Sequence, residues 1–395
     1  MGQWLPPEEK LDPQQKEFLK RENGFLDKKN VWIKGFPGSG KSVLVAYAIK
    51  KILENPETCN NKILLVLFTR SLVDLYKKGF KDMEKNIDVV TCPEFYKMSI
   101  DMYDHIFCDE VQDLSPAILS MFREKSNHVV VAGDENQSIF SIEPFTKQAT
   151  VIPAQIPNLI DAESYALIYI HRLSRSIIAA IQKMMPNINI FEAKRDETKK
   201  DVQIRICQSN SKLEETEYVY KEACRRVEHN YTTAILLPTV EKIIEFCNTM
   251  LTSENKPLWN PVNNQYNRPD WRSLNQHLLT NGISVEYVGN GYGSLSHAER
   301  HKNVVLMTYH SAKGLDFENV FIPYTNDELF RHVNFNNIET LFMVAMTRGK
   351  ENLYITYNGN LLSYVKTFSS ENSICTNIEI NGVQANSDDI MMLDF

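Results

Sequence analysis

The chain has 395 residues, of which 43% are hydrophobic and 24% are charged, and it carries a formal net charge of −7. This length and composition are typical of a globular protein with room for two domains, while the negative charge argues against non-specific capture of nucleic acid over the whole surface. Its apolar runs, such as Ile63 to Phe68, fall far short of the roughly 20 residues that cross a bilayer, which argues against a membrane protein.

The first half of the chain alternates strand-like and helix-like runs. Strands are predicted over residues 31–34, 63–69, 87–91, 105–108 and 129–133, and helices over residues 41–54, 72–81 and 116–124. This alternation predicts a parallel α/β sheet that binds its ligands at the carboxyl ends of the strands.

Residues 35–42 read Gly-Phe-Pro-Gly-Ser-Gly-Lys-Ser and lie between the first predicted strand and the first predicted helix. A glycine-rich surface loop is the alternative, but this context favours a phosphate-binding loop whose amides converge at the start of the helix. Lys41 would reach the β and γ phosphates, and the Ser42 hydroxyl would bind Mg²⁺. The predicted nucleotide-binding residues are Gly35, Pro37, Gly38, Ser39, Gly40, Lys41 and Ser42.

An acidic pair, Asp109 and Glu110, directly follows the predicted strand over residues 105–108. Such a pair is usually a solvated strand end. After a phosphate loop it favours hydrolysis instead, with Asp109 holding Mg²⁺ through water and Glu110 deprotonating the attacking water. Seven cysteines without CxxC spacing predict reduced thiols in a cytoplasmic protein rather than a zinc site.

The second half repeats the α/β alternation. Strands are predicted over residues 202–207, 233–237, 285–288, 303–308, 319–322 and 353–357, and helices over residues 176–185, 214–227, 240–250 and 338–346. The expected domains are residues 1–157 and 158–368, followed by a polar and acidic tail, residues 369–395, for which both disorder and docking to a partner are open. The aromatic and basic residues between 259 and 272 either extend a nucleic-acid channel or anchor a long loop, and the anchor is favoured.

Taken together, the motifs resemble those of superfamily 1 helicases of the UvrD/Rep type. Residues 109–113, Asp-Glu-Val-Gln-Asp, resemble motif II, and residues 133–140 resemble motif III. Further resemblances are residues 11–15 to the adenine-reading Q motif, 68–71 to motif Ia, 173–176 to a weakened motif IV, 308–317 to motif V and 341–348 to motif VI. The series covers the chain from about Leu11 to Tyr357.

The resemblance implies two RecA-like P-loop NTPase domains with parallel sheets, and ATP with Mg²⁺ in the cleft between them. It implies that Gln15 reads the adenine, that Gln137 senses the γ phosphate, and that Gly314 and Asp316 of motif V belong to the nucleotide site. Arg348 is the stronger candidate for the arginine that neutralises the γ phosphoryl group, and Arg175 is second, with Arg172 as its alternative. The implied nucleic-acid-binding residues are Phe68, Thr69, Arg70, Phe140, Tyr309 and His310.

The chain also departs from the family. Val43 and Ser174 stand where relatives carry the two residues that sandwich the adenine, and residues 141–144 replace a run that stacks on DNA. The spacing between motifs leaves no room for large accessory domains, which indicates a stripped motor core. The sequence therefore predicts an ATP-driven translocase on single-stranded DNA. The alternatives are a regulatory ATPase subunit that switches a partner such as a nuclease, for instance in anti-phage defence, and a scaffold without turnover, which the intact catalytic set disfavours.

Overall fold

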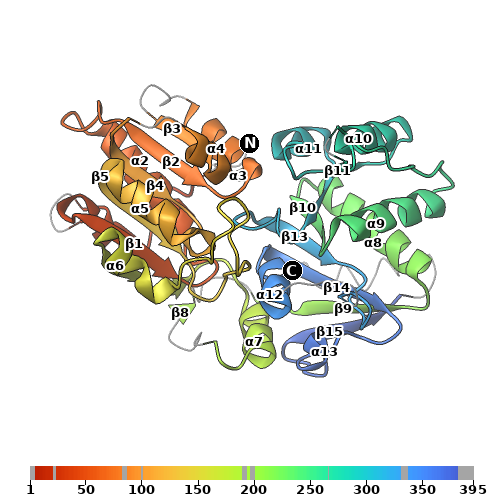
Figure 1. The fold of residues 1–395 in the computed structure, drawn as a ribbon. Coiled ribbons are helices and arrows are strands. Elements are labelled where there is room, and N and C mark those ends of the chain that lie inside the picture. Colours follow the sequence, from red (N-terminus) through yellow and green to blue (C-terminus); the bar gives the residue numbers. More distant parts are fainter. Residues whose placement is uncertain are drawn as a thin grey trace. The chain divides into compact units, whose positions relative to one another are not determined.

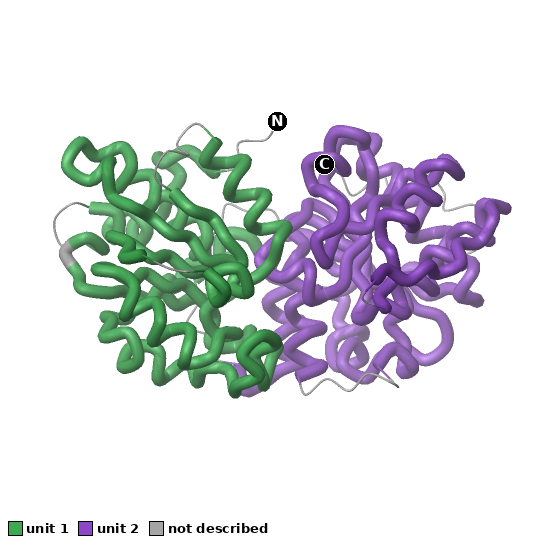
Figure 2. The backbone as a smooth tube through the Cα atoms, turned by 45° about the horizontal axis from the view of Figure 1, so that its top comes forward, with its two compact units in different colours: residues 1–172, 189–199 green, residues 173–188, 200–395 purple. Residues whose placement is uncertain are grey.

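The computed structural model describes residues 5–20, 24–81, 87–98, 101–188, 194–195, 201–265, 267–330 and 337–380. The chain divides into two compact units, residues 1–172 with 189–199 and residues 173–188 with 200–395 (Figure 2). The first unit therefore extends past the expected boundary after residue 157. The physical reason is that strand β6 (Glu163–Leu167) pairs in parallel with strand β1 (Asn30–Gly35) and so belongs to the first sheet.

The first unit contains a six-stranded sheet in the order β3-β2-β4-β5-β1-β6, in which every neighbouring pair is parallel (Figure 1). Besides β1 and β6, its strands are β2 (Ile63–Leu67), β3 (Ile87–Thr91), β4 (Tyr103–Cys108) and β5 (Ser126–Gly133). Its helices are α1 (Pro13–Phe18), α2 (Lys41–Glu54), α3 (Arg70–Gly79), α4 (Cys92–Lys97), α5 (Pro116–Glu124) and α6 (Ile156–Ile160). A separate two-stranded ribbon joins β7 (Tyr169–Ile170) to β8 (Lys194–Arg195).

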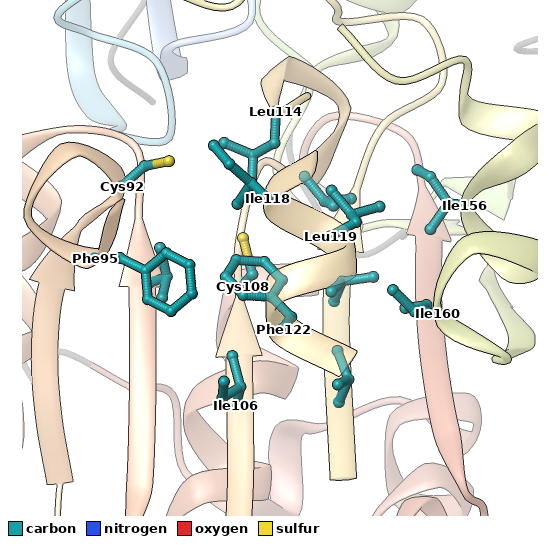
Figure 3. Close-up of a cluster of buried hydrophobic side chains, with 14 of the residues drawn as sticks. Cys92, Phe95, Ile106, Cys108, Leu114, Ile118, Leu119, Phe122, Ile156 and Ile160 are labelled. Atoms are coloured by element: carbon teal, nitrogen blue, oxygen red, sulfur yellow. The ribbon is translucent and has the colours of Figure 1, made fainter. Parts of the chain in front are cut away.

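One face of this sheet packs against α4, α5 and α6 through a single hydrophobic cluster (Figure 3). Ile106 and Cys108 project from the same face of β4 because side chains alternate along a strand. Phe95 of α4 and Phe122 of α5 belong to the same cluster, and their ring centroids are 4.9 Å apart. Burial of each large apolar side chain in the cluster stabilises the folded state by roughly 1.5–3 kcal/mol. The cluster therefore holds β4 and β5, and the starts of the loops that follow them, in place.

The second unit contains a seven-stranded sheet in the order β11-β12-β10-β13-β14-β9-β15, again with all neighbouring pairs parallel. Its strands are β9 (Ile204–Ser209), β10 (Thr233–Leu237), β11 (Val285–Tyr287), β12 (Val304–Thr308), β13 (Phe317–Ile322), β14 (Gly349–Asn358) and β15 (Cys375–Glu379). Its helices are α7 (Arg175–Met184), α8 (Lys212–Glu228), α9 (Val240–Ser253), α10 (Trp271–Thr280), α11 (Leu295–His301), α12 (Ile338–Met346) and α13 (Ser363–Lys366). The expectation of two RecA-like α/β domains with parallel sheets is confirmed.

The second unit includes part of the expected tail and the loop that carries Trp259 and Trp271. The expected tail begins too early, because β15 pairs in parallel with β9 and so places residues up to 380 in the sheet; residues 381–395 lie outside the described residues. Trp259 and Trp271 are 3% and 2% exposed, and Trp271 stacks on Tyr287 at 3.9 Å, so both tryptophans anchor their loop to the unit as favoured. Over the described ranges, the chain has no helix of the length and apolarity needed to traverse a bilayer.

Candidate nucleotide-binding and hydrolysis site

The phosphate loop connects the end of β1 to the start of α2. Gly38 and Gly40 have φ of 75° and 83°, in the left-handed region that disfavours residues with a Cβ. A Cβ on Gly40 would also lie 2.3 Å from Gln15 Nε2, and one on Gly38 would lie 2.8 Å from Arg172 Cβ. Gly40 caps α2 without a side-chain hydrogen bond, which leaves the first amides of the helix for an anion.

Lys41 folds back onto its own loop. Its Nζ donates hydrogen bonds to the carbonyl oxygens of Gly35 at 2.7 Å and Phe36 at 3.0 Å. Burial lowers the pKa of Lys41, while the nearby carboxylates of Asp134, Glu110 and Asp109 act in the opposite direction. The ammonium group thus lies near three carboxylates and is bound to the carbonyl oxygens of its own loop. A bound phosphate could replace these carbonyl contacts.

Ser42 and Asp109 meet directly. Ser42 Oγ donates a hydrogen bond to Asp109 Oδ2 at 2.5 Å, and Asp109 is only 2% exposed. Burial and the neighbouring Glu110 raise the pKa of Asp109 to about 6, against the opposing effect of the Ser42 hydrogen bond. A hydroxyl and a carboxylate are oxygen ligands of the kind that Mg²⁺ prefers, so this pair fits the predicted metal site.

Glu110 adopts φ of 60°, which is unusual for a residue with a side chain and costs of order 1–3 kcal/mol. Gln112 fixes its carboxylate, since Gln112 Nε2 donates to Glu110 Oε2 at 2.7 Å. Gln112 Oε1 in turn accepts from the Asp134 amide at 3.1 Å, and Gln137 is 2% exposed on the same loop as Asp134. One glutamine therefore joins the two predicted motifs that follow β4 and β5.

Gln15, which is predicted to read the adenine, lies against the phosphate loop. Asp12 Oδ1 accepts from the Gln15 amide at 2.8 Å, and Gln15 Nε2 donates to the Ser39 carbonyl at 3.4 Å. His171, which no predicted motif includes, also lies here. The His171 amide donates to the Gly38 carbonyl at 2.9 Å, and its Nε2 lies 2.7 Å from Asp12 Oδ2. The only sequence signal for this residue is that it immediately precedes Arg172.

The three candidate arginines lie in different surroundings. Arg172 belongs to the first unit and packs beside Gly38, where its charge helps to lower the pKa of Lys41. Arg175 is exposed at the start of α7 in the second unit. Arg348 is 2% exposed in the second unit, where its guanidinium donates to the carbonyls of Val344 at 2.8 Å and Leu315 at 3.1 Å and to Thr347 Oγ1 at 2.8 Å.

The predicted nucleic-acid residues divide between the units. In the first, Phe68 and Phe140 lie with ring centroids 5.3 Å apart, Thr69 caps α3, and the exposed Arg70 forms an ion pair with Glu94.

In the second unit, Tyr309 is fully buried beside Phe342, so the structure places it in the core rather than at the surface. Burial and the charge of Lys313 lower the pKa of His310 to about 4, so its ring is neutral at neutral pH. Of the two motif V residues assigned to the cofactor, Gly314 has φ of 79°, and Asp316 forms an ion pair with Lys350 at 3.0 Å.

This geometry defines an α/β protein with a phosphate loop, an acidic pair and a connecting glutamine at the carboxyl end of a parallel sheet. Residues 20–143 match the family model of an AAA domain, and residues 279–360 match that of the UvrD-like helicase C-terminal domain. These two matches, in this order along the chain, confirm that the chain resembles superfamily 1 helicases of the UvrD/Rep type. A helicase-like, nucleic-acid-dependent ATPase is the class of protein that they support.

A search among curated proteins found no match. Among solved structures, the chain is similar to the C-terminal domain of a possible DNA helicase from Lactobacillus plantarum WCFS1, with 13% identity, a TM-score of 0.35, and coverage of 52% of this chain and 98% of that one. A similarity this low says nothing about the function of this chain.

Proposed function

We propose that this chain hydrolyses ATP with Mg²⁺ and uses the cycle to translocate on single-stranded DNA. The observation that carries the first part is the connection within one unit from Ser42 through Asp109 and Glu110 to Gln112. It joins a phosphate loop to an acidic pair by side-chain and backbone hydrogen bonds of 2.5, 2.9 and 2.7 Å.

Ser42 and Asp109 are the residues that would hold Mg²⁺. A bound ion would supply positive charge next to the phosphates of ATP. Lys41 would leave the Gly35 and Phe36 carbonyls and contact the same phosphates. The loop amides before α2 add their partial positive charge without any rearrangement of the helix.

Glu110 is the proposed general base. The residue is 6% exposed, and Gln112 orients its carboxylate, which would take the proton from the attacking water. Gln112 also holds the Asp134 amide and thereby links the base to the loop that carries Gln137. Arg348 and either Arg172 or Arg175 are proposed to neutralise charge on the γ phosphoryl group during turnover.

The adenosine end would lie between Gln15 and His171. Both residues lie close to Gly40: a Cβ added there would be 2.3 Å from Gln15 Nε2 and 3.9 Å from His171 Cδ2. A purine that hydrogen-bonds to the Gln15 amide would therefore lie beside the His171 ring. The His171 side chain is 30% exposed and is fixed by Asp12, so it offers an aromatic face in place of the stacking residues missing at Val43 and Ser174.

Single-stranded nucleic acid would bind to the first unit at Phe68 and Phe140, with Arg70 for the backbone phosphates. Each stacked base contributes roughly 1–3 kcal/mol. In the second unit the partly exposed His310 is the remaining candidate, because Tyr309 is buried. These candidate binding residues are few, and the net charge of −7 repels phosphates elsewhere on the surface. The proposed ligand is therefore nucleic acid that is already single-stranded, not a duplex that the chain must open.

ATP turnover by the purified chain, measured with and without single-stranded DNA, tests this proposal. We expect Mg²⁺-dependent turnover that DNA stimulates and that Lys41→Ala abolishes, together with little unwinding of a blunt duplex. ATP turnover that is the same with and without DNA would contradict translocation but would be consistent with ATP hydrolysis by this chain. Turnover that survives Lys41→Ala would contradict the placement of the site.

A further inference from the structure

Two histidines lie one helical turn apart on α11, in the second unit. The rings of His297 and His301 have centroids 4.0 Å apart and an interplanar angle of 31°. Residues at positions i and i+4 project from the same side of a helix. The His297 side chain is 49% exposed, and His301 is also exposed, so both rings are accessible to a small ligand from solvent.

The hydrogen bonds of both rings determine which nitrogen carries the proton. His297 Nδ1 lies 2.6 Å from Glu286 Oε2, and His301 Nδ1 lies 2.9 Å from the His297 carbonyl oxygen. An ionised carboxylate and a carbonyl can only accept, so each Nδ1 must be the donor. In the neutral imidazole, the Nε2 of each ring therefore carries the lone pair.

Glu286 makes this arrangement rigid. It lies on β11 at the edge of the sheet, is 7% exposed, and accepts a second hydrogen bond from the Ser294 amide at 3.0 Å. Its carboxylate thus ties both the N-cap residue of α11 and the His297 ring to the strand. A carboxylate on the far nitrogen is the usual partner of a metal-binding histidine, since it fixes the ring and raises its basicity.

We propose that His297 and His301 form a bidentate site for a divalent transition-metal ion such as Ni²⁺, Cu²⁺ or Zn²⁺, with the two Nε2 atoms as ligands. Imidazole nitrogen suits these ions, whereas Mg²⁺ prefers oxygen, so the site is distinct in chemistry from that at Ser42 and Asp109. Within the described part of the chain, no group of three or more His, Cys, Asp and Glu residues could hold a metal. Water would fill the other positions, and the ion would exchange readily.

Calorimetric titration of the tag-free full chain with Ni²⁺, in a non-chelating reductant, tests the site. We expect one equivalent to bind, and both His297→Ala and His301→Ala to lose it. His229→Ala is the matched control: His229 is exposed, its Nδ1 lies 2.8 Å from the Arg225 carbonyl four residues earlier, and no histidine stands four residues to either side of it in the sequence. That variant should bind as the unaltered chain does.

Glu286→Gln separates the orienting role from the ligands. The amide keeps the shape but lowers the basicity of the His297 ring, so Ni²⁺ affinity should fall about tenfold or more while the stoichiometry stays at one. Circular dichroism and the melting temperature without metal check that each variant is folded. Unchanged binding in folded His297→Ala and His301→Ala, or equal loss in His229→Ala, would overturn the proposal.

Discussion

Ser42 Oγ donates a 2.5 Å hydrogen bond to Asp109 Oδ2, which brings together two oxygen atoms from residues 67 positions apart in the sequence. Ser42 lies in the first turn of α2, and Asp109 follows the last residue of β4. Because β4 is separated from β1 by β5 alone, the loops after these strands share one edge of the sheet. This contact joins the two residues that we propose as ligands of Mg²⁺.

Glu110→Gln should stop hydrolysis and keep ATP binding. Glutamine retains the shape and the strained φ of 60° but cannot accept a proton from water, so turnover should fall by roughly 10²–10⁴-fold. Single-turnover hydrolysis together with a binding assay of labelled ATP measures both effects. If the variant hydrolyses ATP at the original rate, Glu110 is not the base.

Arg172→Ala and Arg175→Ala should differ. Arg172 packs beside Gly38 and influences Lys41, whereas Arg175 is exposed in the other unit. We therefore expect Arg172→Ala to weaken ATP binding or hydrolysis by about tenfold or more, as for one lost charge-assisted contact of roughly 1.5–3 kcal/mol. Steady-state ATPase kinetics of the two variants decide between them, and the reverse order would restore Arg175 as the motif IV arginine.

Gly40→Ala should destabilise the first unit and disrupt nucleotide binding. Gly40 has φ of 83°, and a Cβ there would meet Gln15 Nε2 at 2.3 Å. Gly282→Ala is the matched control, because Gly282 has a similar φ of 72° with no atom within 4 Å of an added Cβ. The control should lose only the backbone cost of roughly 1–2 kcal/mol. Urea unfolding and ATP binding should both show a larger loss for Gly40→Ala.

Acid should destabilise the first unit through His105 and His128. These residues pair across β4 and β5 with ring centroids 5.2 Å apart, and burial lowers the pKa of each to about 4. The unfolded chain therefore takes up protons first, so stability that is complete above pH 6.5 is lost as the pH falls toward 4. Each ring contributes up to about 3 kcal/mol.

His128→Phe tests the origin of this loss. His128 Nε2 is buried with no hydrogen-bond partner among the described residues, so the variant should be no less stable at pH 7. Between pH 7 and pH 5 its free energy of unfolding should fall less than that of the unaltered chain, as measured in urea at each pH. An identical fall in both proteins would show that other groups cause the acid sensitivity.

The sequence predicted the elements whose patterns are local. The helices expected over residues 41–54, 116–124 and 338–346 match α2, α5 and α12, because their apolar periodicity and flanking residues lie within a few turns. Where the observed limits of an element differ from the predicted ones, as at the start of α3, a helix N-cap explains the difference. Phe68 and Thr69 leave the predicted strand because the Thr69 side chain accepts from the Leu72 amide and starts α3 two residues early.

Other features depend on contacts between segments that are far apart in the sequence, and only the tertiary structure shows them. Strands β6 and β15 were not predicted, because their short and polar sequences become strands by pairing with β1 and β9. In the same way, nothing near His171 in the sequence indicates that it meets Asp12, 159 positions away. The phosphate loop and the acidic pair were predictable because each is encoded by a few adjacent residues; their neighbours were not, because long-range pairing places them.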